Sequence, residues 1–214
     1  PYILRSLVLL INFATAFLLM KDLGFSPRKS VNYLKEMKGI LKASIDNGVK
    51  VTPVKWLMIS SIFITGVSFY IFYALQPFLL KLYGDEKAYT VAGLVAAISA
   101  FAQVAGGFSA PYIRKVFTTR TTALIAGGIL TGVILILVSQ TNNFWIALIL
   151  IFIWGLIFAA LSPIRQAYLN GLIPSAQRAT VLSFDSLIGS SGGIVTQTLL
   201  GKVADMYSYS ASYL

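Results

Sequence analysis

Six long apolar segments follow one another along the chain, and they constrain the fold more than any other feature. A helix that crosses the hydrocarbon core of a bilayer needs about 20 mostly apolar residues. No segment alternates with a period of two, which argues against spanning strands. Because backbone groups in lipid must bond within their own segment, we predict spanning helices at Pro1–Met20, Val54–Leu80, Tyr89–Ile113, Thr121–Ser139, Phe144–Leu169 and Thr180–Ala204.

The composition disfavours most catalytic classes. Of the 214 residues, 57% are hydrophobic and 11% are charged, against about 25% charged in a typical soluble domain. Histidine and cysteine are absent and only seven residues are acidic, so the usual metal ligands, thiol nucleophile and proton shuttle are missing. We predict no catalytic residue, no metal site and no cofactor. A membrane-embedded enzyme is disfavoured because the spans hold no neighbouring pair of carboxylates.

The net charge of +10 lies in loops between apolar segments, which indicates a lipid bilayer as the partner and not nucleic acid. Basic residues gather between the first and second segments, after the third, and around the connection from the fifth to the sixth. Cytoplasmic loops carry such an excess, and basic and non-basic loops alternate once per crossing. The pattern predicts a multi-pass protein of the plasma or inner membrane.

The first linker has a helical pattern of its own. Between Ser30, a suitable N-cap, and Gly48, a suitable residue just past a helix end, apolar residues recur at helical spacing and charged residues fill the other face. This pattern predicts an amphipathic helix. It either lies on the cytoplasmic membrane surface or packs on the inner loops as a soluble linker helix, and the sequence leaves both open.

One span, a long basic linker and five closely spaced spans resemble the major facilitator superfamily from its sixth helix to its eleventh. The run Ser162–Asn170, followed by Ile173-Pro174 and Gln177–Thr180, resembles the end of the tenth helix, the inner loop and the start of the eleventh in bacterial drug-exporter-like members. The stretch Gly107–Lys115 resembles the loop between the second and third helices of each half, with Pro111 where the family has an acidic residue.

The resemblance implies an all-α integral membrane protein, a fragment of a twelve-helix major-facilitator-type bundle with six spans present. Residues 1–20 would be the last helix of the first half, 21–53 a cytoplasmic linker with an amphipathic helix, and 54–214 an incomplete second-half bundle. We expect the N-terminal half of the same chain to be missing, because Pro1 opens directly into an apolar run. The substrate is expected between the two halves, near the middle of the membrane.

Polar residues inside the spans are the candidates for function, because polar groups in lipid are costly and carriers expose them to a central cavity. For Tyr70 and Tyr73, a place in the aromatic belt at the outer interface is an equal alternative. Trp154 is also open to a lipid-facing or packing role. The candidate substrate pathway comprises Tyr70, Tyr73, Gln76, Gln103 and Trp154.

Asp185 is the one carboxylate predicted well inside a span, so it needs a partner or a function. Arg165, near the inner end of the fifth span, and Arg178, two turns before Asp185, are the possible partners. We predict a gating ion pair among these three; the alternatives are a boundary carboxylate that orders the helix end and a proton carrier. Close helix packing is expected at Gly107, Gly128, Gly132, Gly189, Gly192 and Gly193.

With the resemblance, these features predict a secondary active transporter that moves a small molecule by alternating access. The expected activity is proton-coupled efflux of an apolar or drug-like compound, and the expected partners are that substrate, a coupling proton, the bilayer and the missing N-terminal half. Because Asp185 is the only carboxylate expected in a span, the main proton carrier is expected in that half. The alternatives are a metabolite uptake carrier of the same fold and a non-transport multi-span protein.

Overall fold

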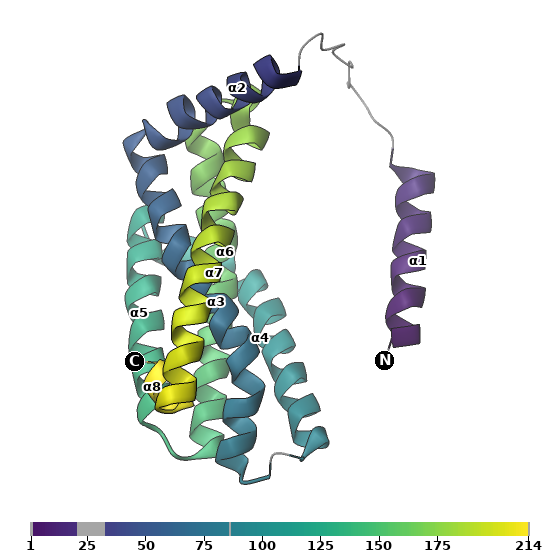
Figure 1. Ribbon diagram of the computed structural model, residues 1–214, viewed down its shortest axis with the longest axis vertical. Helices are drawn as coiled ribbons and strands as arrows, with labels where there is room; N and C mark the ends of the chain where they lie inside the picture. Colours follow the sequence, from purple (N-terminus) through teal and green to yellow (C-terminus); the bar gives the residue numbers. More distant parts are fainter. Residues whose placement is uncertain (1, 21–32, 86, 214) are drawn as a thin grey trace. The chain divides into compact units, whose positions relative to one another are not determined.

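The computed structural model describes residues 2–20, 33–85 and 87–213, and among them it contains helices and their connections only. The chain divides into two compact units, Pro1–Lys38 and Gly39–Leu214, which are described separately. The first holds α1 (Tyr2–Leu19) and the start of α2 (Tyr33–Ser44) (Figure 1). The second holds the rest of α2 and then η1 (Ile45–Val49), α3 (Thr52–Tyr83), α4 (Tyr89–Val116), α5 (Arg120–Gln140), α6 (Phe144–Leu172), η2 (Ser175–Gln177), α7 (Arg178–Met206) and α8 (Tyr209–Ser212).

Each apolar segment expected to span the membrane coincides with one long helix, so the all-helical prediction is confirmed. Among the described helices, α3, α4, α5 and α6 are long and apolar enough to cross a membrane. The apolar stretch in α1 is shorter, and α7 is rich in glycine and serine. Crossings by α1 and α7 therefore stay predictions.

Local signals set several helix ends. Pro53 lies in the first turn of α3, where its missing N–H costs no intrahelical bond. Gly84 ends the same helix with a φ of 86°, a left-handed conformation that glycine adopts without strain. The side chains of Thr119 and Asn143 accept backbone N–H bonds at the starts of α5 and α6, as N-caps do.

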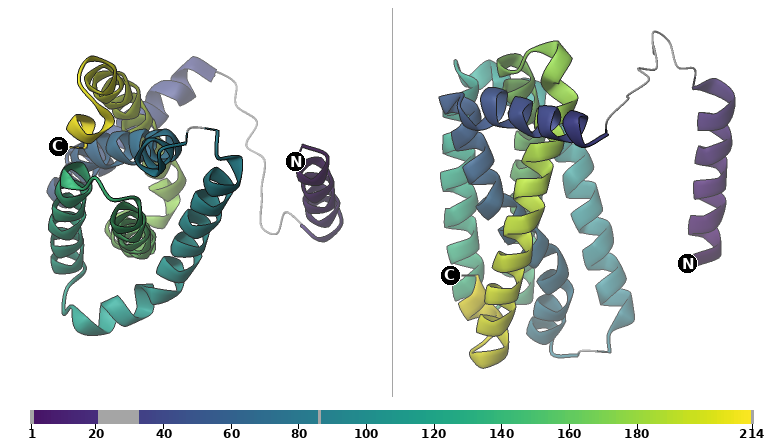
Figure 2. Two further views of the ribbon diagram at one scale, coloured as in Figure 1. Left: turned by 90° about the horizontal axis from the view of Figure 1, so that it is seen from below. Right: turned by 45° about the horizontal axis from the view of Figure 1, so that its top comes forward.

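The five long helices of the second unit form one bundle in which α6 contacts α3, α4 and α5, while α7 packs along α3 (Figure 2). Glycines allow the closest approaches. A Cβ atom built on Gly106 of α4 would lie 2.3 Å from the carbonyl oxygen of Leu156 on α6. One built on Gly192 of α7 would lie 2.7 Å from the Cα of Ile62 on α3. The backbones themselves are therefore in contact at both places.

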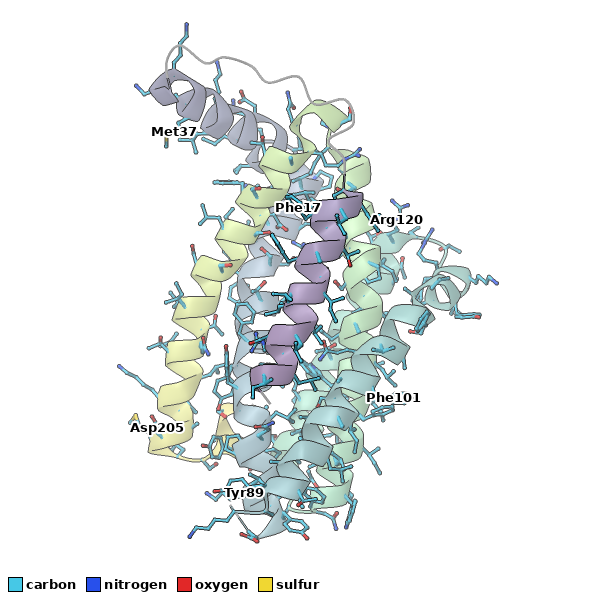
Figure 3. All side chains as sticks on the ribbon, turned by 90° about the vertical axis from the view of Figure 1, so that its right-hand side faces the viewer. Phe17, Met37, Tyr89, Phe101, Arg120 and Asp205 are labelled. Carbon is cyan, nitrogen blue, oxygen red and sulfur yellow. The ribbon has the colours of Figure 1, made fainter. Side chains whose placement is uncertain are left out.

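The two ends of the bundle differ in charge. The start of α3, the end of α4, the start of α5 and the connection from α6 to α7 share one end, which carries Lys55, Arg114, Lys115, Arg120 and Arg178. We call this the basic end. In Figure 3, Arg120 lies at the basic end, whereas Tyr89 and Asp205 lie at the opposite end. The loops expected in the cytoplasm are thus brought together, as the alternation of loop charge requires.

The linker helix does not end as the sequence suggested. Gly48 was expected just past the helix end, but it lies inside the π-helical turn η1 and is buried. A Cβ on Gly48 would lie 2.9 Å from the Cε atom of Met58. Gly48 therefore allows η1 to pack closely against α3, and its φ is not in the left-handed region of a helix cap. Ser30, the expected N-cap, lies outside the described residues.

The main apolar core lies toward the end opposite the basic end, and the C-terminal segment closes it. Tyr70 of α3 is 5% exposed, and its hydroxyl bonds with that of Ser212. The ring of Tyr213 packs against Tyr70 at 6.0 Å and against Phe78 at 5.1 Å between ring centroids. These contacts attach α8 to α3.

Replacing Tyr70 by phenylalanine should lower the free energy of unfolding by about 1 kcal/mol, the usual net value of one buried hydrogen bond. The Ser212 hydroxyl keeps its bond to the Tyr209 carbonyl, so no second group loses its partner. Tyr73→Phe is the matched control, because Tyr73 is 66% exposed on the same helix. Thermal unfolding of both variants measures the difference, and equal melting temperatures would refute it.

Candidate functional site

A cavity of 300 Å³ opens between α3, α4 and α6. Its wall falls near the middle of each helix, since α3 runs from residue 52 to 83, α4 from 89 to 116 and α6 from 144 to 172. It therefore lies about half-way along the bundle. It is lined by Ser68, Phe69, Phe72 and Tyr73 of α3, Gln103 of α4, and Trp154, Gly155 and Phe158 of α6.

The cavity wall is aromatic and carries no charged side chain. The rings of Trp154 and Phe158 stack with centroids 5.5 Å apart. The Ser68 hydroxyl donates to the Ile64 carbonyl of its own helix, which leaves Tyr73 and Gln103 as the polar groups for a guest, while Trp154 offers its ring. Trp154 Nε1 is buried without a hydrogen-bond partner among the described residues. Such a wall suits an uncharged ligand with apolar, aromatic surface.

A buried ion pair joins α6 to α7. The Arg165 guanidinium donates to both carboxylate oxygens of Asp185, from Nη1 at 2.9 Å and from Nη2 at 2.8 Å. Nη2 also donates to the Leu57 carbonyl of α3 at 3.0 Å. The side chains of Arg165 and Asp185 are 19% and 8% exposed. Bidentate pairing of this kind fixes geometry as well as charge, so one arginine ties three helices together.

This ion pair lies between the cavity and the basic end. Leu57 is five residues into α3, whereas the α3 cavity residues begin at Ser68. At a rise of about 1.5 Å per residue, the pair is roughly 16 Å from the cavity wall along α3. Arg178 is exposed at the first position of α7. Within the described part of the chain, Asp185 pairs with Arg165 and not with Arg178.

The family model of the Major Facilitator Superfamily matches residues 1–197. The chain belongs to the Major Facilitator Superfamily. This confirms the superfamily-level expectation, and it makes the protein a multi-pass membrane protein. No curated protein matches the chain.

Among solved structures, this superfamily chain is similar to a crystal structure of a bacterial homolog of the human lysosomal transporter Spinster, in an inward-facing and unoccupied conformation. The TM-score is 0.56 and the sequence identity is 21%. The likeness covers 94% of this chain and 44% of that one, so the chain spans under half the length of that transporter. At this identity the comparison shows the shared fold.

The structure brings together three of the five residues of the expected substrate pathway. Tyr73, Gln103 and Trp154 come from three different helices to one cavity. Tyr70 lies elsewhere, buried in the core against α8. Gln76 is exposed one turn beyond Tyr73 and is not part of the cavity wall. No three His, Cys, Asp or Glu side chains of the described chain are grouped as metal ligands.

The glycines expected at close helix contacts divide into two sets. Gly189, Gly192 and Gly193 of α7 face α3, where an added Cβ would lie within 3.4 Å of Thr65, Ile62 or Phe69. An added Cβ on Gly107, Gly128 or Gly132 would meet no heavy atom within 4 Å in the described chain. The closest α4 contact is made by Gly106, the neighbour of Gly107.

Sequence reasoning did not select Phe69, Phe72 or Phe158 for the cavity, although a signal was present. Phe69 and Phe72 lie four and one positions before Tyr73, and Phe158 lies four positions after Trp154. Residues three or four apart share a helix face. Phe158 shares the helix face of Trp154 in the sequence pattern, and projection of the aromatic residues around Tyr73 would have found Phe69. Nothing in the sequence indicated that the Leu57 carbonyl accepts a hydrogen bond from Arg165.

A larger cavity of 540 Å³ lies on another side of the bundle, between α3, α5 and α6. Most of the exposed surface of its wall is apolar, and Gly128 and Gly132 are part of it. Its hydroxyl-bearing residues include Ser60, Thr131 and Ser162. Arg165 and Tyr168 reach it only at the basic end. We place the candidate site in the smaller cavity, because stacked aromatic rings there meet the polar side chains of Tyr73 and Gln103 at mid-bundle depth.

Proposed function

We propose that this chain forms part of a secondary active transporter that moves a small molecule across the membrane by alternating access. The observation that carries the proposal is the mid-bundle cavity, where Tyr73, Gln103 and Trp154 converge among aromatic rings. Substrate sites of secondary transporters lie near the bilayer midplane, and membership of the superfamily supports transport and not catalysis. Crossings by α1 and α7 would complete six spans.

The proposed substrate is an uncharged, apolar or drug-like compound, and the proposed direction is proton-coupled efflux. The uncharged aromatic wall supports the substrate class. Asp185 is already engaged by Arg165, so we propose that the coupling carboxylate lies outside this chain, in a further half of the transporter. A metabolite carrier is the second candidate, favoured by the Tyr73 and Gln103 side chains in the cavity wall.

Counterflow in sealed vesicles tests the carrier proposal. The protein that contains this chain is reconstituted, vesicles are loaded with unlabelled chloramphenicol, a neutral aromatic amide, and radiolabelled chloramphenicol is added outside. A carrier gives saturable uptake with a transient overshoot of label, and an imposed proton gradient should change the rate. Flux that rises linearly with concentration and shows no overshoot would overturn the carrier mechanism for this probe.

Trp154→Ala should raise the half-saturating probe concentration about tenfold, because the stacked ring is lost from the cavity wall, which is worth about 1.4 kcal/mol. Trp154→Phe keeps the ring and should show a smaller rise. Trp145→Ala is the matched control: it removes a tryptophan from the same helix at its exposed outer end. Equal values for Trp154→Ala and Trp145→Ala would remove Trp154 from the substrate site.

A further inference from the structure

The helix formed by α2 and η1 presents an uncovered apolar stripe. Met37, Leu41, Ile45 and Val49 follow at intervals of four residues. Their exposures fall along the chain as 64%, 52%, 37% and 36%. The end nearest α3 is docked: Gly48 is buried, and a Cβ built on it would lie 2.9 Å from Met58 Cε and 3.5 Å from Val181 Cγ1. Within the unit Gly39–Leu214, the described inner loops therefore leave Leu41 and Ile45 exposed.

Lysines flank the stripe. Lys38 and Lys42 are exposed, and at about 100° per residue Lys42 lies a quarter-turn or so around the helix from Leu41. Asp46 forms an ion pair with Lys50 at 2.6 Å, and the hydrogen bond from Lys50 lowers the Asp46 pKa. Asp46 is therefore neutralised by its own partner, and Lys38 and Lys42 give this side of the helix a positive charge.

The depth of the helix formed by α2 and η1 in the bilayer follows from its short connection to α3. Only residues 50 and 51 separate η1 from α3, a helix long and apolar enough to cross the membrane. The first turns of α3 carry Lys55 and the 62% exposed Trp56, whose ring lies 5.9 Å from the Lys55 ammonium. Tryptophan and lysine are enriched where spans meet headgroups. The helix thus leaves the bundle at headgroup level.

We propose that α2 and η1 form an interfacial helix that lies on the bilayer at the basic end. Its stripe enters the boundary between headgroups and acyl chains, and Lys38 and Lys42 bind anionic headgroups. A bilayer supplies apolar surface and negative charge side by side, which matches both faces of this helix. The proposal concerns anchoring to lipid and does not depend on the transport activity.

Site-specific fluorescence tests this placement. These 214 residues contain no cysteine, so once every cysteine elsewhere in the protein is replaced by serine, Leu41→Cys supplies a unique thiol for an environment-sensitive nitrobenzoxadiazole label. The labelled full protein is reconstituted in phosphatidylcholine vesicles with and without phosphatidylglycerol. At Leu41→Cys the label should be quenched by shallow spin-labelled lipid and protected from aqueous iodide. At Lys42→Cys, the matched control on the basic side, the label should show the reverse.

The same label tests whether Lys38 and Lys42 contribute to membrane binding. Each lysine near an anionic surface contributes about fivefold to binding, so Lys38→Gln with Lys42→Gln should lower the ratio of lipid-protected to exposed label about 25-fold in phosphatidylglycerol vesicles. Salt at about 1 M should do the same, because it screens the charges. Lys202→Gln, at the far end of α7, should have no effect.

Three results would overturn the proposal. A Leu41→Cys label open to iodide places the helix in water. A label protected from both iodide and lipid quencher means that protein covers the stripe. Equal quenching with and without phosphatidylglycerol removes the role of the lysines. Lipid quenching at Leu41→Cys that phosphatidylglycerol strengthens supports the proposal.

Discussion

Replacing Asp185 by alanine should lower the free energy of unfolding by about 3 kcal/mol, the lower end of the range for a broken buried ion pair, because the Arg165 guanidinium that loses its counter-charge is partly exposed. Both carboxylate bonds, at 2.8 and 2.9 Å, are lost, and the Leu57 carbonyl alone cannot balance the positive charge. Unfolding followed by tryptophan fluorescence measures the effect. Asp205→Ala is the matched control: it removes an exposed carboxylate from the far end of the same helix and should change stability by less than about 0.5 kcal/mol.

A double variant separates the structural role of the pair from a role in gating. Apolar residues of similar volume often replace a buried ion pair without loss of stability, so Arg165→Met with Asp185→Leu should recover most of the stability lost in Asp185→Ala. We expect its transport to stay at least tenfold below the wild type, equivalent to about 1.4 kcal/mol. Wild-type transport in a stable double variant would leave the pair a structural role only.

The reason to expect a transport defect lies in where the pair acts. Arg165 contacts α7 through Asp185 and α3 through the Leu57 carbonyl, between the cavity and the basic end. Hydrogen bonds to charged groups fix orientation as apolar contacts do not. We propose that the three helix ends move as one body when the cavity opens toward the basic end. Apolar replacements would keep the packing and lose that fixed orientation.

Gly192→Ala should destabilise the bundle by about 1–3 kcal/mol, the usual cost of overpacking. The added Cβ would lie 2.4 Å from Ile62 Cγ2, 2.7 Å from Ile62 Cα and 2.8 Å from its carbonyl oxygen. A side chain can rotate away, but the Ile62 backbone cannot, so α3 and α7 must separate along their whole contact.

Gly201→Ala provides the control for this substitution on the same helix. No heavy atom lies within 4 Å of a Cβ added at Gly201, and alanine is the better helix former by about 1 kcal/mol. This variant should be as stable as the wild type or slightly more so. Equal destabilisation of the two variants would show that glycine is needed on α7 for its flexibility and not for contact with α3.

The helices could be predicted from the sequence because two independent signals agree. Apolar length marks each span and loop charge marks each crossing, so the errors in the helix ends were small. Gly48 was misplaced because glycine permits both a left-handed cap and a close contact. The close contact of Gly48 is with Met58 of α3. The sequence pattern does not show that these two residues lie close together.

Some residues of the candidate site could be predicted from the sequence because they lie near the middle of a membrane-spanning helix. Tyr73, Gln103 and Trp154 lie near the middle of their helices, and polar groups at that depth need a cavity or a partner. Tyr70 has the same depth, but α8 covers it through Ser212 and Tyr213. That contact comes from residues beyond the last predicted span, so no periodicity on α3 could reveal it.

Accessibility of the cavity from the two sides of the membrane tests the central claim most directly. This chain has no cysteine of its own; with every cysteine elsewhere in the protein replaced by serine, Gln103→Cys is exposed to a membrane-impermeant thiol reagent added outside or inside sealed vesicles. Phe101→Cys, about 200° around α4 at nearly the same depth, is the control. Our account predicts that reagent from either side labels Gln103→Cys and leaves Phe101→Cys unlabelled. Labelling of Gln103→Cys from neither side, or from one side only, would contradict an alternating-access cavity between α3, α4 and α6.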